Sequence, residues 1–182
     1  MTISLAPAAS FPMHDPTPAQ PAPNTPAEQW LARGAVLAPQ ELDCLKRAVR
    51  QHLNLPDDTP LCLEHFAAVR ELWLSSEPIT DAGLAWLAAA DSPLSALRHL
   101  HLIETQVTDV GLAALADKSS PLVSLSELYL DETQVTDAGL AALASAASPF
   151  TALLHVSVSD TAVTNAGFVS LKNRFPAITF YN

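Results

Sequence analysis

The sequence is poor in basic residues. Nine Lys and Arg stand against 19 Asp and Glu among 182 residues, which gives a formal net charge of −10. An acidic surface repels phosphate groups, so we expect neither nucleic acid nor an anionic membrane as a partner. The chain also has no apolar run near the roughly 18–20 residues that a membrane-spanning helix needs.

Cysteine and glycine are scarce as well. Cys44 and Cys62 are the only cysteines. We predict that both are buried reduced thiols, with a disulfide between neighbouring helices as the alternative. Only five glycines occur, and four of them recur at intervals of 28 residues. These four are Gly83, Gly111, Gly139 and Gly167.

That interval belongs to a unit of 28 residues that is written four times. The hexapeptide Glu104–Asp109 recurs letter for letter as Glu132–Asp137. A fixed period of this length indicates a solenoid, in which each unit stacks on the next. The four copies begin at Val69, Leu97, Leu125 and Leu153.

The second copy shows how each unit should fold. Leu100 and Leu102 alternate with polar residues, as in a short strand with one buried face. Thr108 is a good helix N-cap, and the charge of Asp109 suits the positive end of a helix. Gly111 costs helix propensity, so its recurrence indicates close backbone packing at the turn. Each copy therefore predicts a strand followed by a helix.

These motifs resemble the leucine-rich repeat family. The turn T-x-V-T-D-x-G-L-x-x-L is most similar to the ribonuclease-inhibitor-like or cysteine-containing branch, in its bacterial form. The resemblance covers residues 69–182. It implies an α/β solenoid, a short right-handed horseshoe segment with a parallel concave sheet of about five strands and helices on the convex side.

One position departs from the family pattern. The family's asparagine ladder position is occupied by Glu77 in the first copy and by threonine in the other three. We expect the threonines to hydrogen-bond the turn backbone as asparagine does, and Glu77 to be frayed or solvated. The threonines are Thr105, Thr133 and Thr161.

The chain divides into three parts. Residues 1–25 are rich in proline and alanine and predict a disordered arm. Residues 26–68 predict an N-terminal helical cap, which a solenoid needs to cover one end of its core. Within the cap we expect an amphipathic helix from Pro39 to Leu53, with Arg47 on its solvated side, and a second helix from Thr59 to Ala67.

The repeats end differently from how they begin. The pattern Phe175-x-x-Ile178-x-Phe180 predicts a fifth strand around Ala177–Tyr181. The uncovered edge of such a strand is prone to pair with another chain. We therefore expect that self-association through the C-terminal strand edge is possible.

Strand alternation identifies the residues on the concave face. One column across the strands reads Glu71, His99, Glu127 and His155. The next column reads Trp73, His101, Tyr129, Ser157 and Thr179. Neighbouring strands lie about 4.8 Å apart, so the members of each column should be in contact.

We expect this face to bind a partner. Trp73 and Tyr129 are amphipathic rings of the type that anchors interfaces. Acidic residues such as Asp131 surround them, which favours a partner protein that carries Lys or Arg beside an apolar side chain. In the alternative interpretation the rings only cover aliphatic neighbours. The charges of the first column are then screened by solvent and contribute little. The candidate partner-binding residues are Glu71, Trp73, His99, His101, Glu127, Tyr129, Asp131 and His155.

A metal site or an active site is less consistent with this pattern. His99 and His101 are about 6.6 Å apart along one strand, whereas tetrahedral zinc needs convergent side chains. An open sheet also excludes little water. We therefore expect no catalytic residues, no metal and no cofactor.

The sequence thus favours a non-catalytic, cytoplasmic protein-interaction module. The alternative is a bacterial type III effector that is secreted into a host cell, because residues 1–25 resemble such secretion signals in composition. Leu37–Glu41 also resembles the start of an F-box, which would make that effector a ubiquitin-ligase adaptor.

A secretion reporter fused to residues 1–25 separates these two hypotheses. If the arm is a type III signal, the reporter leaves the cell in a secretion-competent strain and stays inside a strain without the apparatus. Retention in both strains would contradict the effector hypothesis.

Overall fold

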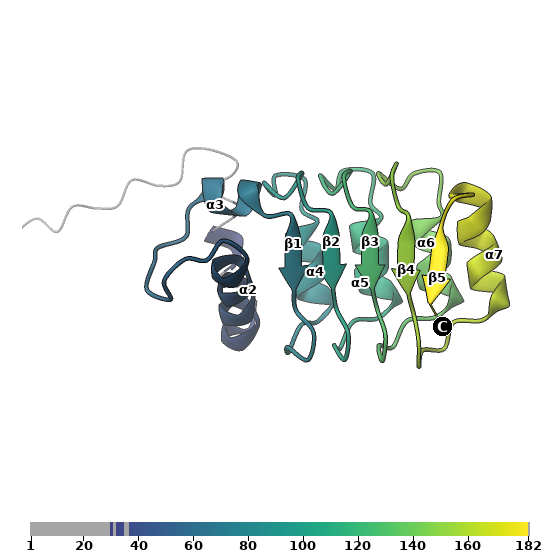
Figure 1. Cartoon of the computed structure of the whole chain (residues 1–182), viewed down its shortest axis with the longest axis horizontal. Helices are drawn as coiled ribbons and strands as arrows, with labels where there is room; N and C mark the ends of the chain where they lie inside the picture. The colour runs from purple at the N-terminus through teal and green to yellow at the C-terminus, as the bar shows by residue number, and fades with distance from the viewer. Residues whose placement is uncertain (1–29, 31, 35–36, 182) are drawn as a thin grey trace, which may run out of the picture.

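A computed structural model describes residue 30, residues 32–34 and residues 37–181. Five short strands form one parallel sheet in the order of the chain (Figure 1). They are β1 (Glu71–Trp73), β2 (His99–His101), β3 (Glu127–Tyr129), β4 (His155–Ser157) and β5 (Thr179–Tyr181). The predicted arm, residues 1–25, lies outside the described residues.

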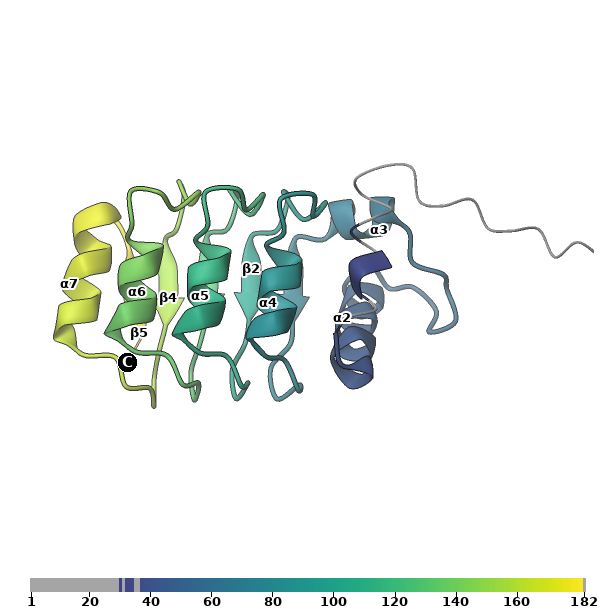
Figure 2. The ribbon, with the colours of Figure 1, turned by 180° about the vertical axis from the view of Figure 1, so that it is seen from behind.

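One helix follows each of the first four strands and packs behind the sheet (Figure 2). These helices are α4 (Asp81–Leu87), α5 (Asp109–Leu115), α6 (Asp137–Leu143) and α7 (Asn165–Arg174). Two more, α2 (Pro39–His52) and α3 (Leu63–Ala68), lie at the N-terminal end of the sheet. The α/β solenoid expected from the 28-residue period is confirmed.

The core lies between the sheet and its helices. In the second repeat Leu100, Leu102 and Leu112 are completely buried. Leu100 and Leu102 come from the strand segment and Leu112 from helix α5, so both layers of each repeat contribute to one continuous apolar interior. His99 and His101, which alternate with these two leucines, face away from the helices because side chains alternate along a strand.

A carboxylate links each repeat to the next. Asp109 Oδ1 accepts hydrogen bonds from the backbone N–H groups of Thr136 at 2.8 Å and Gly139 at 3.0 Å. Its Oδ2 accepts from the Thr136 hydroxyl at 2.7 Å. Asp137 is bonded in the same way to Thr164 and Gly167. We call this set of contacts the Asp–Thr–Gly ladder.

The ladder explains the recurring glycine. A Cβ atom on Gly139 would lie 2.5 Å from Asp109 Oδ1 and 2.8 Å from Leu112 Cδ1. Only a residue without a side chain lets the carboxylate approach the first helical turn this closely. The expected close packing at the glycine is confirmed, and the group that packs there is the acid of the preceding repeat.

Glu41 of helix α2 supplies the first rung, which the sequence pattern did not identify. Its Oε1 accepts from the Thr80 backbone N–H at 2.9 Å, the Thr80 hydroxyl at 3.0 Å and the Gly83 N–H at 2.9 Å. The residue is only 2% exposed. The cap therefore offers the first repeat the same carboxylate that every later repeat receives.

Aromatic packing attaches the cap to the first repeat. Trp30 stacks on Trp86 of helix α4 with ring centroids 4.0 Å apart, and Phe66 meets Trp30 edge-on at 5.0 Å. Each tryptophan donates its indole N–H to the backbone carbonyl of the other, at 2.8 and 3.1 Å. These contacts cover the end of the core beside strand β1.

Three expectations about the cap and the first repeat need correction. Helix α3 begins at Leu63 and not at Thr59, because Cys62 is its N-cap and donates its backbone N–H to His65 Nδ1 at 3.1 Å in a capping box. Glu77 is not frayed, because Arg47 donates two hydrogen bonds to its carboxylate at 2.8 and 2.9 Å. The Arg47 head is therefore paired and is not simply solvated.

The prediction for the cysteines is half right. Both thiols are free, and Cys44 is buried, but Cys62 is exposed at the start of helix α3. Burial raises the pKa of the Cys44 thiol to about 11, which keeps it protonated and unreactive at neutral pH.

The threonines at the family's asparagine position bond the turn backbone as expected. Each donates its hydroxyl to the carbonyl three residues earlier, at 2.6–2.7 Å. The acceptors of Thr105, Thr133 and Thr161 are the carbonyls of Leu102, Leu130 and Val158. Threonine in place of asparagine thus still provides a side-chain hydrogen bond to the backbone of the turn.

The fifth strand exists, but its register differs from the predicted one by two residues. Phe180 pairs with Val156 and Tyr181 with Ser157, so Thr179 lies beside His155 in the first column. Helix α7 has ten residues where α4 to α6 have seven, and the chain needs Pro176 and Ala177 to return to the sheet. A slip of two residues keeps each side chain on its predicted face.

The ladder can be tested at one rung. Asp109→Ala removes three hydrogen bonds to the next turn, and bonds to a charged acceptor are worth about 1.5–3 kcal/mol each at most. We expect the free energy of unfolding to fall by about 2 kcal/mol in urea titrations, since water compensates part of the loss.

Asn165→Ala is the matched control. Asn165 holds the equivalent position in α7, and the described residues contain no later helical turn for it to bond. This variant should change stability by only a few tenths of a kcal/mol. Equal losses at both positions would show that the side chain acts within its own helix, which would contradict the ladder.

Candidate functional site

The candidate site is the face of the sheet opposite the helices, which we call the open face. The central residues of strands β1 to β4 are buried, and the residues on either side of them point to the open face. The parallel register places Glu71, His99, Glu127 and His155 side by side. It also aligns Trp73, His101, Tyr129 and Ser157. The two predicted columns are therefore confirmed across these four strands.

His99 lies between two carboxylates. Its Nδ1 is 3.2 Å from Glu71 Oε1, and its Nε2 is 3.7 Å from Glu127 Oε1. A neutral imidazole carries one N–H group, so both contacts are attractive only when both ring nitrogens are protonated. His99 therefore bridges the carboxylates of strands β1 and β3.

Glu127 joins the first column to the second. Its Oε2 accepts a hydrogen bond from the Tyr129 hydroxyl at 2.8 Å. Burial, followed by this hydrogen bond to the carboxylate, raises the pKa of Tyr129 to about 12. The phenol therefore remains a donor at neutral pH and fixes the orientation of the ring.

The second column is a stack of rings. Trp73 and His101 are parallel within 6° with centroids 3.7 Å apart, and His101 and Tyr129 are equally parallel at 4.4 Å. His101 is sandwiched and only 8% exposed, whereas Trp73 is 56% exposed. The middle of the stack is therefore closed, and its first ring is open to solvent.

The pKa of His101 is lowered below its ordinary value. Burial between the rings is the main cause, and the charge of His99 adds to it, while Glu71 and Glu127 act in the opposite direction. His101 is therefore neutral at pH 7 and serves as an aromatic spacer between the two larger rings.

The far end of the stack contains a ring that sequence reasoning missed. Tyr129 contacts His155 at 5.2 Å between centroids, and His155 contacts Tyr181 of strand β5 at 4.7 Å. His155 also lies 3.1 Å from the Thr179 hydroxyl through its Nδ1. Tyr181 is 66% exposed. The register error at β5 concealed it, since only the correct pairing places Tyr181 beside the column.

Asp131 lies at the edge of the open face, but its carboxylate is already bonded within the protein. Its Oδ1 accepts from the Ser157 hydroxyl at 2.5 Å and from the Ser159 backbone N–H at 2.6 Å. These bonds join the ends of strands β3 and β4. Asp131 can add negative charge to the rim, whereas Glu71 has the more accessible carboxylate, with a 40% exposed side chain.

Comparison with known proteins agrees with this geometry. The family model described as "Leucine Rich repeat" matches residues 95–116, a stretch that contains strand β2 and helix α5. The fold is a leucine-rich repeat solenoid. No curated protein sequence matches the chain significantly.

Two further findings concern the described part of this solenoid. Its helices include none that is long and apolar enough to cross a membrane. Within residues 30, 32–34 and 37–181, no group of three His, Cys, Asp or Glu side chains is arranged to hold a metal ion.

The buried histidine gives the solenoid a testable pH dependence. Because the pKa of His101 is lowered on folding, the unfolded chain binds more protons as pH falls below about 6.5. His101 therefore contributes most to stability above that pH, and its contribution is lost as pH falls towards the folded pKa.

His101→Phe keeps an aromatic ring in the stack and removes the titration. The difference in unfolding free energy between wild type and this variant should shift in favour of the variant between pH 7 and pH 5, as measured by urea titration. Parallel stability curves for the two proteins over this range would contradict the assignment.

Proposed function

We propose that the open face binds a segment of a partner protein in which Lys or Arg stands next to an apolar or aromatic side chain. The observation that carries this proposal is the exposed ring of Trp73, adjacent to the accessible carboxylate of Glu71. A leucine-rich repeat is consistent with a protein-interaction module, and the turn sequence supports the ribonuclease-inhibitor-like branch.

The ring stack favours an apolar contact. Trp73 is held against His101, so it loses little conformational freedom when a partner packs on it. Large, pre-organised aromatic side chains contribute much of the binding energy in protein interfaces. A ring fixed at the first strand is therefore suited to anchor a partner side chain.

The charges favour a basic contact. Glu71 and Glu127 both border the stack, with side chains 40% and 36% exposed. The whole chain carries ten excess negative charges. A cation on the partner would gain both from the carboxylates and from the face of the indole ring.

The same geometry argues for binding and against catalysis. His99 directs both ring nitrogens at carboxylates, and His101 is enclosed by rings. Neither imidazole is placed to exchange a proton with a substrate. Five strands span only about 20 Å, so the interface is small and its affinity depends on a few anchors.

Selection of peptides from a displayed random library on the immobilised full-length chain tests the proposal. We expect enrichment of Lys or Arg next to Leu, Ile, Phe, Tyr or Trp. Trp73→Ala should weaken binding of the selected peptides by roughly 30-fold, the loss that corresponds to about 2 kcal/mol at an interface anchor.

Val110→Ala is the control, because Val110 is 70% exposed on helix α5, behind the sheet. Glu71→Gln should weaken binding less and should make it less sensitive to salt. Equal peptide affinity for wild type and Trp73→Ala, or enrichment of acidic peptides, would refute the proposal.

A further inference from the structure

Two phenylalanines at the C-terminal end occupy core positions that are left open. Phe168 of helix α7 is equivalent to Leu112, and Phe180 of strand β5 pairs in register with Val156. Leu112 and Val156 are completely buried because a later repeat packs on them. Phe168 and Phe180 remain partly exposed among the described residues.

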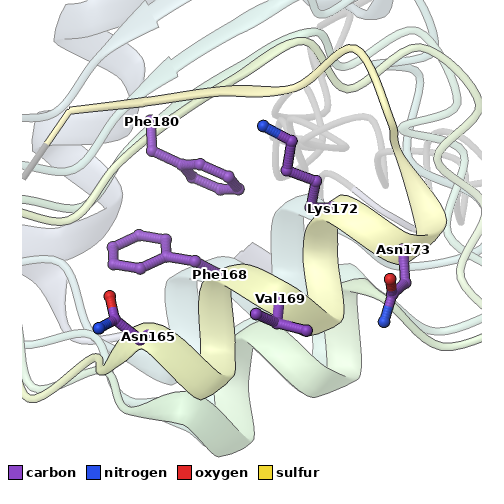
Figure 3. Close-up of a pocket in the computed structure, with 6 residues that line it drawn as sticks. All are labelled: Asn165, Phe168, Val169, Lys172, Asn173 and Phe180. Carbon is purple, nitrogen blue, oxygen red and sulfur yellow. The ribbon is translucent and has the colours of Figure 1, made fainter.

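These two side chains form the floor of an apolar groove (Figure 3). Their ring centroids are 4.7 Å apart, and the groove has a volume of about 480 Å³. Val169, which follows Phe168 on helix α7 and is 59% exposed, also lines the groove. The remaining lining residues are Asn165, Lys172 and Asn173. A partner that extends the solenoid would bury this apolar surface.

The strand next to the groove has an available edge. The Thr179 N–H donates to the Leu154 carbonyl, and the Tyr181 carbonyl accepts from the Val158 N–H. Both residues thus use their backbone groups on the side of strand β4. Because backbone groups alternate in direction along a strand, the N–H and C=O of Phe180 point away from the sheet.

We propose that this end binds a second copy of the chain about a two-fold axis perpendicular to the sheet. Phe180 of each copy then pairs with Phe180 of the other, and the two residues exchange both backbone hydrogen bonds, as in an antiparallel pair. The two sheets join into one sheet of ten strands, with both open faces on the same side. A two-fold contact of this kind is closed and stops at a dimer.

The α7 helices can also pack against each other about this two-fold axis. Val169 is near the middle of helix α7 and lines the groove together with Phe180. If the axis passes beside Val169, the two α7 helices run antiparallel and Asn165 of one copy lies opposite Asn173 of the other. Two amide side chains can donate to and accept from each other, so the polar rim of the groove is complementary to itself.

The charges at this end are also complementary under the two-fold rotation. The sequence has no acidic residue after Asp160, and Lys172 and Arg174 lie at the C-terminal end of helix α7. Asp137 of helix α6 lies against the N-terminal turn of α7, where it accepts hydrogen bonds from Thr164 and Gly167. The antiparallel arrangement brings the basic end of each helix to the acidic end of its copy. This fit favours a second copy over an unrelated partner.

Analytical ultracentrifugation of the full-length chain tests the proposal. Wild type should sediment as a reversible dimer. Val169→Arg places two like charges near the axis and should weaken self-association about 100-fold or more. The control Val110→Arg adds the same charge to an exposed valine on helix α5, away from the groove, and should remain dimeric.

Disulfide trapping tests the geometry directly. In a Cys62→Ser background, Val169→Cys should form an intermolecular disulfide under mild oxidation, whereas Val110→Cys should not. A wild type that stays monomeric at the highest attainable concentration would overturn the proposal, and so would a dimer that tolerates Val169→Arg. Peptide binding by the open face should persist in Val169→Arg, so this proposal and the proposed function fail independently.

Discussion

The structure depends on a carboxylate that each repeat presents to the next. Asp109 both starts its own helix and accepts the N–H and hydroxyl groups with which the following helix starts. Local folding and stacking are therefore coupled, because a helical turn is satisfied only when its neighbour is in place. Hydrogen bonds from Thr164 lower the pKa of Asp137, which shows that the folded state favours the charged carboxylate. The ladder begins at Glu41, and at the equivalent position of the last helix the residue is the uncharged Asn165.

The chemistry of the open face follows from that stacking. No single repeat contains a paired histidine or a ring stack, since His99 meets Glu71 and Glu127 only across neighbouring strands. The 28-residue spacing holds these side chains in register without a bulge, so the contacts of the face join neighbouring repeats, apart from the Tyr129–Glu127 hydrogen bond within β3. The geometry of the open face consequently depends on the ladder that spaces its strands.

The two ends of the solenoid differ in how their apolar core is covered. At the N-terminal end the stacked Trp30 and Trp86 complete the core, and Arg47 neutralises Glu77. At the C-terminal end Phe168 and Phe180 only narrow the opening, and the apolar groove between helix and strand persists. The described part of the solenoid thus has a covered N-terminal end and an apolar groove at its C-terminal end.

The period, the strands, the helix starts within the repeats and the face to which each strand residue points could all be predicted from the sequence. These features are local or strictly periodic, so alternation and capping rules suffice to predict them. The contacts made by residues outside the regular repeat could be found only from the tertiary structure. Glu41 acts on a turn about 40 residues away, Arg47 pairs with Glu77, and the longer helix α7 shifts β5 so that Tyr181 and not Thr179 extends the stack. Such contacts depend on how the non-repeating ends pack against the repeats, and the spacing of residues along the chain does not predict that packing.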